Sequence, residues 1–365
     1  MRNRFTAIAA ISMLFLVVPN LPVLGQQPGA GDVPWWYVPY PQTFDAAKLN
    51  STPGWIRVDG NRFVDATGKT VILRGVNISD PDKLVRNGRW SKQYFQVIKD
   101  WGATVVRVPV HPVAWKERGP NEYFKLLDQA VTWASEVGLY LIVEWHSIGN
   151  LEAGLFQHPM HETSKSETYQ FWRGIAHRYG AVPTIAFYEI MNEPTTFRGQ
   201  LGTITWQQWK TINEEIIAII RAHDAKAIPL VAGFDWAYEL HNVKDAPINA
   251  PGIGYVSHPY PMKTNEPFEQ NWEKDFGYVA DTYPVFATEI GFMAPEDPGA
   301  HIPVLADEGY GKRITEYFQK KGISWTVWCF DPDWPPQLIS DWSYTPTRQG
   351  AFFRKVMLDA RAAGK

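Results

Sequence analysis

Short apolar runs that favour β-strands alternate with amphipathic helical patterns along most of this chain of 365 residues. The strand-like runs, rich in β-branched and aromatic residues, lie at 71–76, 104–110, 140–145, 185–191, 228–232, 254–258, 285–288 and 324–329. Helical patterns lie at 92–101, 122–137, 167–179, 206–223, 268–278, 311–320 and 350–363. This alternation predicts a parallel sheet, and the number of units predicts an α/β fold of the (β/α)8 barrel type. The connection around 237–243 is the weakest unit, because its helical pattern is short or irregular.

Two of the expected strands end in a glutamate. The run 185–191 leads into Asn192-Glu193-Pro194, where the proline stops the strand, and the run 285–288 leads directly into Glu289. Active sites of parallel barrels lie at the carboxyl ends of the strands, so both carboxyl groups are expected at the same mouth. The two strand-end glutamates therefore suggest a catalytic pair.

These segments resemble glycoside hydrolase family 5, the cellulase and mannanase family of retaining (β/α)8 barrels, through Asn192-Glu193-Pro194 and Glu289. The resemblance covers about residues 55–360. It implies that Glu193 is the acid/base and Glu289 the nucleophile of a retaining hydrolysis. Such a reaction needs two carboxyl groups about 5 Å apart.

Further strand ends resemble family positions. Arg107 lies towards the end of the second strand, where the resemblance implies that it pairs with Glu289 and keeps this carboxylate ionised. His146 ends the third strand, where the family has a histidine that binds sugar hydroxyl groups. Glu144 departs from the family, which often has Asp or Asn there, so it receives no role.

The fourth, sixth and eighth strand ends complete the implied site. Asn192 is expected to hold the sugar 2-hydroxyl group, and Tyr260 is expected to donate a hydrogen bond to the nucleophile. His258, two residues before Tyr260, matches the spacing of the family's His and Tyr. Trp328 resembles the tryptophan that forms a platform for the sugar.

Three further features leave their interpretation open. Trp236 is either a subsite residue or part of the core. The loop after the eighth strand contains Asp331, Asp333 and Trp334, which are candidates for shaping a subsite and receive no assigned role. Cys329 is expected to be a small buried apolar side chain.

Composition and motifs exclude several classes of function. The formal net charge is −3, so no basic face suggests nucleic acid or an anionic membrane as a partner. The 17 tryptophans favour a surface that stacks on sugar rings. The sequence has no His-Glu-x-x-His pair, phosphate-binding glycine loop or cysteine cluster, and His158 and His161 are interpreted as loop residues. We expect neither a cofactor nor a metal.

The N-terminal region predicts export. Residues 1–25 have the layout of a secretory signal peptide, with basic residues before an apolar run, and an uncleaved membrane anchor is the alternative. Residues 26–54, which include Trp35-Trp36-Tyr37, predict an arm or linker, and 55–365 the catalytic barrel. Asp59-Gly60-Asn61 lies between two strand patterns and predicts a β-hairpin that can plug the bottom of the barrel.

The expectation is therefore a secreted protein, extracellular or periplasmic, that acts as a monomer on a β-linked polysaccharide or oligosaccharide. The implied reaction is hydrolysis of internal β-1,4-glucan bonds by double displacement. β-Mannan or another β-glucan is the alternative substrate, and transglycosylation is the alternative outcome of the same chemistry. A carbohydrate-binding barrel without catalysis is the alternative from a different class.

Overall fold

The computed structural model describes residues 33–364, so the expected signal peptide at 1–25 lies outside the described residues. The chain divides into two compact units, residues 1–38 and residues 39–365. The described part of the first unit contains the short 3-10 helix η1 (Trp35–Tyr37), in which the rings of Trp35 and Trp36 meet edge to face. No helix among the described residues is long and apolar enough to span a bilayer.

The second unit is built around a closed barrel of eight strands, all within the described residues. Every neighbouring pair in the barrel is parallel. The strands follow one another around the barrel as β3 (Arg74–Asn77), β4 (Val105–Val110), β5 (Tyr140–Trp145), β8 (Ile185–Glu189), β10 (Ile228–Ala232), β11 (Gly254–Val256), β12 (Val285–Ile290) and β13 (Ser324–Val327). The predicted (β/α)8 barrel is confirmed.

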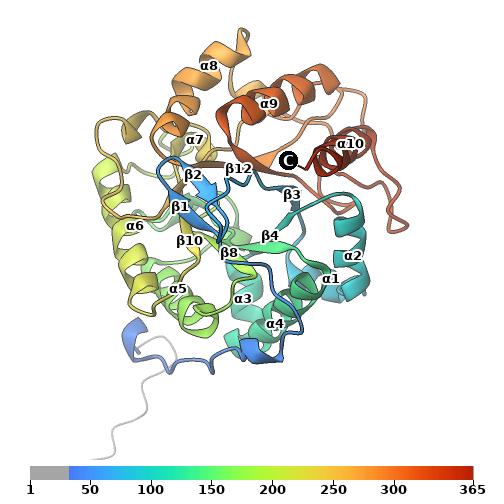
Figure 1. Cartoon of the computed structure of the whole chain (residues 1–365). Coiled ribbons are helices and arrows are strands. Elements are labelled where there is room, and N and C mark those ends of the chain that lie inside the picture. The colour runs from blue at the N-terminus through green and yellow to red at the C-terminus, as the bar shows by residue number, and fades with distance from the viewer. Residues whose placement is uncertain (1–32, 365) are drawn as a thin grey trace, which may run out of the picture. The chain divides into compact units, whose positions relative to one another are not determined.

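Helices cover the outside of the barrel, as Figure 1 shows in a view along its axis. They are α1 (Pro81–Arg86), α2 (Lys92–Asp100), α3 (Pro112–Arg118), α4 (Pro120–Val137), α5 (Lys165–Tyr179), α6 (Trp206–Arg221), α7 (Phe234–Ala237), α8 (Phe268–Asp275), α9 (Glu308–Lys321) and α10 (Arg348–Ala362). The longer helices match the predicted patterns. The short helices α1 and α3 were not predicted, because six or seven residues are too few to show a period. The weak connection around 237–243 contains α7 and the 3-10 helix η4 (His241–Val243).

The helix α6 shows how sequence fixes such an element. Thr205 accepts a hydrogen bond from the backbone of Gln208, whose side chain bonds back to Thr205, so a capping box begins the helix. Trp209, Ile212 and Ile216 are spaced three or four residues apart and are buried against the barrel and its neighbours.

Side chains along each strand point alternately outwards to the helices and inwards to the barrel interior. The outward side chains form one apolar layer, and the inward ones form an apolar layer and a charged layer. On β4, Val106 and Val108 pack outwards against the helices, whereas Val105 belongs to the apolar cluster inside the barrel. Inside residues have a period of two, so Arg107 follows Val105 inwards, and Glu189 follows Phe187 on β8 in the same way. The barrel interior is therefore apolar at the amino ends of the strands and charged near their carboxyl ends.

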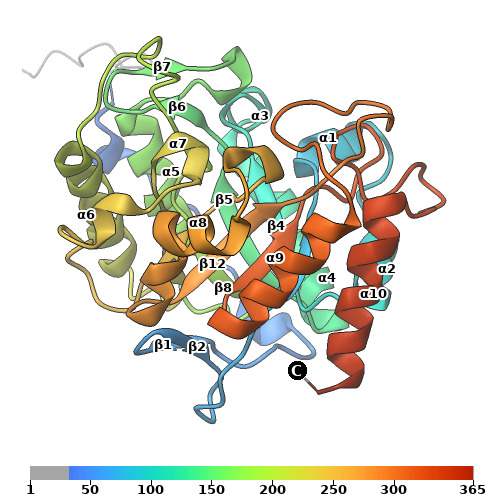
Figure 2. The ribbon, with the colours of Figure 1, turned by 90° about the horizontal axis from the view of Figure 1, so that it is seen from above.

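A hairpin closes the apolar end, as predicted. The strands β1 (Arg57–Asp59) and β2 (Arg62–Val64) pair antiparallel, and Phe63 packs its ring against Phe187 and Phe286 from the barrel interior. Figure 2 places this hairpin at the end of the barrel opposite to the strands β6 (Ile148–Asn150) and β7 (Leu155–Phe156). The remaining strand, β9 (Glu193–Pro194), pairs with β6 above the charged end.

Residues 39–54 lie along the helices α4 and α5. The ring of Tyr40 stacks on His177 at 4.4 Å between centroids, and the guanidinium carbon of Arg173 lies 3.6 Å from the centre of the Tyr40 ring. The backbone N–H of Phe44 donates to the carbonyl of Arg178 at 2.8 Å, shortly before the 3-10 helix η2 (Ala46–Lys48). The part of the expected arm that belongs to the second unit is thus held by specific contacts.

We predict that Gly75→Ala strongly destabilises the barrel. A Cβ atom at Gly75 would overlap the carbonyl oxygen of Val105 on the neighbouring strand, so the strands would have to separate. The expected cost is about 1–3 kcal/mol or more, as for other overpacked cores, measured by urea unfolding. Gly54→Ala is the matched control, because nothing lies within 4 Å of its added Cβ. Equal stability of the two variants would contradict the strand packing described here.

Candidate active site

The carboxyl ends of the barrel strands surround a cavity of about 680 Å³. Its lining combines the two expected glutamates with polar and aromatic side chains from several strand ends, among them His146, Asn192, Glu193, Trp236, Tyr260, Glu289, Trp328 and Trp334. A larger cavity, of about 860 Å³, is lined by neither Glu193 nor Glu289, and it shares Met262 with the lining of the first cavity. The smaller cavity is the candidate active site, because it has the convergent polar groups that ligand sites require.

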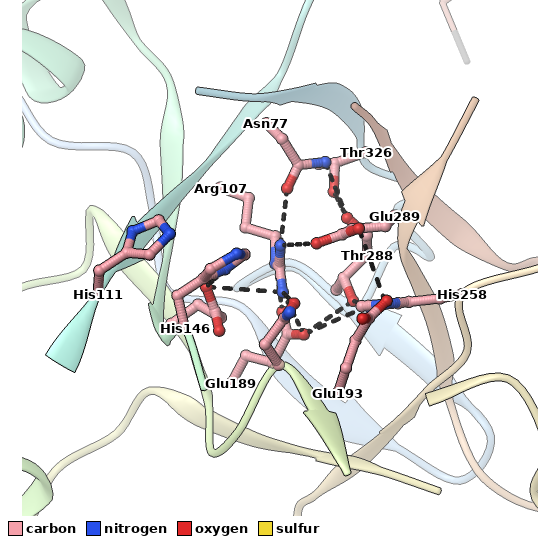
Figure 3. Close-up of polar contacts among 12 residues, drawn as sticks. Asn77, Arg107, His111, His146, Glu189, Glu193, His258, Thr288, Glu289 and Thr326 are labelled. Atoms are coloured by element: carbon pink, nitrogen blue, oxygen red, sulfur yellow. Dashed lines mark hydrogen bonds and ion pairs between the residues drawn. The ribbon is translucent and has the colours of Figure 1, made fainter. Parts of the chain in front are cut away.

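Arg107 lies at the centre of the charged layer beneath this cavity (Figure 3). Its side chain is fully buried, and it binds Glu189 with two hydrogen bonds, of 2.7 Å from Nε and 2.8 Å from Nη2. Nη1 donates to Glu289 at 2.7 Å and to Asn77 at 2.9 Å, and Nη2 also donates to Asn192 at 2.7 Å. The expected pair of Arg107 and Glu289 is present, and one guanidinium orients four side chains, which come from β3, β8, β12 and the segment after β8.

Glu289 reaches the cavity through an irregularity in its strand. The register of β12 against β13 shifts between Ala287 and Ile290, and such bulges re-aim side chains. One oxygen of Glu289 accepts from Arg107, and the other accepts from the hydroxyl of Tyr260 at 2.9 Å, as expected. Burial raises the pKa of Glu289, whereas His258 and Arg107 oppose this rise. The buried carboxyl group of Glu289 is therefore surrounded by Arg107, Tyr260 and His258.

Glu193 faces Glu289 across the cavity. It follows β8, and its backbone in β9 is held by pairing with Ile148 of β6. One carboxylate oxygen lies 3.1 Å from Nδ1 of His258, and the side chain is 13% exposed. An oxygen of Glu193 and an oxygen of Glu289 lie within 4.8 Å of one another. The two strand-end glutamates therefore meet, as their positions in the sequence suggested.

His258 lies beneath both glutamates and is fully buried. Its Nδ1 faces Glu193, and its Nε2 lies 2.9 Å from the hydroxyl oxygen of Thr288 and 3.7 Å from Glu189. Burial by itself lowers the pKa of His258, but the surrounding carboxylates, Glu289 first among them, raise it to about 9. At neutral pH the imidazolium thus balances part of the negative charge around the cavity.

His146 and Trp328 form one wall of the cavity. The two rings are stacked, with centroids 5.6 Å apart and planes at 15°. Nδ1 of His146 lies 2.9 Å from the buried carboxyl group of Glu144, which is also 3.7 Å from Arg107. Burial lowers the pKa of His146 and raises the pKa of Glu144. Glu144 thus acts on the cavity through His146, although sequence alone gave it no role.

Trp236 lines the cavity and is only partly buried, so it is not part of the core, and its role as a subsite residue stays a prediction. Its Nε1 donates to Gln157 at 2.8 Å, and Nζ of Lys263 lies 4.5 Å from its ring centre. Asp235, Trp236 and Ala237 all have positive φ angles, of 54°, 56° and 57°. Three consecutive non-glycine residues in the left-handed region are strained, which is a feature of functional sites.

The loop after β13 forms a separate polar network. Asp331 is fully buried and accepts hydrogen bonds from the hydroxyl of Ser79 and from Lys83, the latter at 2.6 Å. Lys83 also binds Asp333 at 3.0 Å and lies 5.7 Å from the ring centre of Trp334. Trp334 lines the cavity, so this network positions one cavity wall. The neighbouring Cys329 is buried, as predicted.

Residues 64–333 match the family model described as cellulase, glycosyl hydrolase family 5. The chain belongs to this family. A crystal structure of a β-glucanase from Saccharophagus degradans is 50% identical, with a TM-score of 0.87, and the match covers 90% of this chain and 99% of that one. The same β-glucanase has been solved in complex with cellotetraose. The endoglucanase Cel5A catalytic domain of Thermobifida fusca is 22% identical with a TM-score of 0.68, which shows the shared fold over 84% of this chain and 97% of that one.

The curated relatives include endoglucanases that are longer than this chain. Endoglucanase A of Butyrivibrio fibrisolvens is 28% identical over 289 residues, which are 75% of this chain and 60% of that protein. Endoglucanase E-5 of Thermobifida fusca is 26% identical over 291 residues, which are 77% of this chain and 56% of that protein. The chain thus spans less than two thirds of the length of these relatives.

Sequence reasoning missed three residues of the buried network in this family 5 site. Glu189 binds Arg107 and accepts from Thr288 at 3.0 Å, and Asn77 bridges Arg107 and the carbonyl of Thr288. The sequence held one signal for Glu189, because a glutamate inside an apolar parallel strand requires a cationic partner. Arg107 is the corresponding charge, on β4, which β5 separates from β8.

The raised pKa of His258 predicts a pH-dependent stability. The stabilisation is fully present below the ordinary histidine pKa of about 6.5 and is lost as pH rises through about 9. The unfolding free energy is expected to fall by on the order of 3 kcal/mol across this window, measured by urea unfolding at several pH values. His258→Gln removes this fall, whereas the exposed His301→Gln retains it. An identical pH dependence in wild type and His258→Gln would refute the assignment.

Proposed function

We propose that this chain is a retaining β-glucanase in which Glu289 is the nucleophile and Glu193 the acid/base. The observation that carries the proposal is that carboxylate oxygens of Glu193 and Glu289 lie within 4.8 Å of one another. Retaining glycosidases have carboxyl groups about 5–5.5 Å apart, whereas inverting enzymes need about 6.5–9.5 Å for a water molecule between them. Membership of glycosyl hydrolase family 5 and the similarity to a β-glucanase support the same chemistry.

In the first step Glu289 attacks the anomeric carbon while Glu193 gives its proton to the leaving oxygen. The contacts of Glu289 suit this role, since Arg107 and Tyr260 hold both of its oxygens and fix the direction of attack. The attack forms a bond between Glu289 and the sugar and breaks the glycosidic bond, and Glu193 becomes a carboxylate. His258, 3.1 Å from Glu193, stabilises the carboxylate that forms.

In the second step Glu193 takes a proton from water, and the hydroxyl attacks the glycosyl-enzyme. Glu289 leaves as a carboxylate, and Glu193 regains its proton. Asn192 is the proposed partner of the sugar 2-hydroxyl group in both steps, because it lines the cavity and its Oδ1 is occupied by Arg107, which leaves its Nδ2 as a donor. Hydrogen bonds to this hydroxyl strengthen in the transition state.

The proposed substrate is a β-glucan cut at internal β-1,4 bonds. The S. degradans relative is a β-glucanase crystallised with cellotetraose, and the curated relatives are endoglucanases. Trp328 and Trp236 both line the cavity, where aromatic faces can stack on sugar rings. The apolar run at 5–18 supports the further proposal that the protein is exported before it meets this polymer.

Removal of either glutamate is expected to abolish turnover in a folded protein. Glu289→Gln loses the nucleophile and should reduce kcat by at least roughly 10³-fold, and Glu193→Gln by about 10²–10⁴-fold. Reducing-end release on carboxymethyl cellulose, mixed-linkage glucan, laminarin and glucomannan measures this, with the exposed Glu122→Gln as the matched control. Cleavage of glucomannan alone would move the substrate to mannan. Substantial activity in Glu289→Gln would exclude it as the nucleophile.

The stereochemistry of the first product tests the mechanism separately. Double displacement predicts that the β-anomer appears first, because two inversions restore the original configuration. Proton NMR of a digest of cellotetraose, recorded before mutarotation, resolves the two anomers. Initial release of the α-anomer would show single displacement, even if both glutamates prove essential. Oligomers longer than the substrate in the same digest would indicate transglycosylation.

A further inference from the structure

Three histidines from three different segments meet at one edge of the candidate active site. His111 follows β4, His146 follows β5, and His161 ends the 3-10 helix η3 (Pro159–His161). Their side chains are more than nine-tenths buried, and one ring nitrogen of each lies within 4.8 Å of one of each of the others. Figure 3 shows His111 and His146 next to one another, on the side of Arg107 away from His258.

Each of these histidines uses its Nδ1 for a contact with an oxygen. Nδ1 of His111 lies 3.2 Å from the Asp80 carboxylate, and Nδ1 of His146 lies 2.9 Å from Glu144. Nδ1 of His161 lies 2.9 Å from the backbone carbonyl of His146. Carboxylates and carbonyls that accept from Nδ1 fix the ring and leave the Nε2 lone pair for another partner, which is the outer shell typical of metal-binding histidines.

A further observation concerns the Nε2 atom of His111. Nε2 of His111 is buried and has no hydrogen-bond partner among residues 33–364, a rare situation that calls for an explanation. The ring lies 4.3 Å from that of His146 and 5.8 Å from that of His161, measured between centroids. Trp334 contacts His111 edge to face at 5.3 Å, so the ring is held on a further side.

We infer that His111, His146 and His161 form a binding site for a divalent transition-metal ion of the Zn²⁺ class. Neutral imidazole nitrogens suit Zn²⁺, Cu²⁺, Ni²⁺ and Co²⁺, whereas Mg²⁺ and Ca²⁺ prefer oxygen ligands. Three histidines leave a fourth coordination position, and the cavity that His146 and His161 line provides the access to it. The earlier expectation of no metal rested on local motifs, and this set is spread over 51 residues.

The geometry requires a modest contraction of the cluster. Zn–N bonds of about 2.0–2.1 Å place the nitrogens of a tetrahedral site about 3.4 Å apart. Small shifts of the His111 and His161 side chains, which both follow or lie outside the barrel strands, would be needed for this movement. Because His146 also forms the cavity wall beside Trp328, the bound ion would occupy space next to the sugar site and inhibit turnover.

Isothermal titration of the tag-free protein with ZnCl₂ tests the site without using activity. One equivalent is expected to bind, and His111→Gln and His161→Gln are each expected to weaken binding at least about tenfold. His158→Gln is the matched control, because His158 is exposed, lies three residues before His161 and is outside the cluster. Thermal unfolding without metal establishes that each variant is folded, and MgCl₂ is the negative ligand.

The main alternative to this inference is that the ion binds at a second cluster of possible ligands. Glu193, His258 and Glu289 also bring three possible ligand atoms within 4.8 Å of one another. Binding that survives both histidine substitutions and disappears in Glu289→Gln would place the ion there and overturn the inference. Absence of saturable Zn²⁺ binding at about 100 µM would also overturn it, since a three-histidine site should bind well below this concentration. A visible Co²⁺ spectrum typical of four-coordinate cobalt, lost in His111→Gln, would support the assigned ligands.

Discussion

The buried guanidinium of Arg107 is the interaction on which this site depends. A cation inside a protein is costly unless it is paired and fully hydrogen-bonded, and each of its three nitrogens has an oxygen partner here. Its partners come from β3, β8 and β12 and from the segment after β8, so one side chain ties together segments that are distant in sequence. Removing Arg107 would take this cation away from the buried carboxylates of Glu144, Glu189 and Glu289, and would therefore disturb the site and the barrel together.

The barrel makes this arrangement possible because its interior is layered. Phe63, Phe187 and Phe286 fill the end that the hairpin closes, so the charged layer has a dry floor. Above this floor, side chains that point inwards from neighbouring strands can meet only one another. The low polarizability of the floor strengthens each ion pair above it and explains why burial acts so strongly on the pKa of Glu289 and His258.

Much of this could be predicted from the sequence, and the exceptions have physical reasons. The strands, the long helices and the pair of glutamates follow from local patterns, because apolar periodicity and strand ends are visible in the chain. Glu189 was missed since it lies in a buried strand, where both faces are covered and alternation does not mark an inward residue. The irregularity of β12 that re-aims Glu289 has no signal such as a glycine. The three-histidine cluster depends on how separate loops meet, which only the fold determines.

Trp236 shows how such a barrel can prepare a surface before any ligand arrives. Its backbone and those of both neighbours hold a conformation that L-residues rarely adopt, and Gln157 and Lys263 fix the ring from two sides. A ring whose direction is set by the main chain has little rotational freedom left to lose when a ligand packs against it. Folding rather than binding therefore bears the entropic cost of orientation. Glycine in place of Asp235 or Ala237 would relieve the backbone strain and stabilise the fold, but it would also let the Trp236 ring move more freely. Stability and the rigidity of this ring therefore oppose one another at this turn.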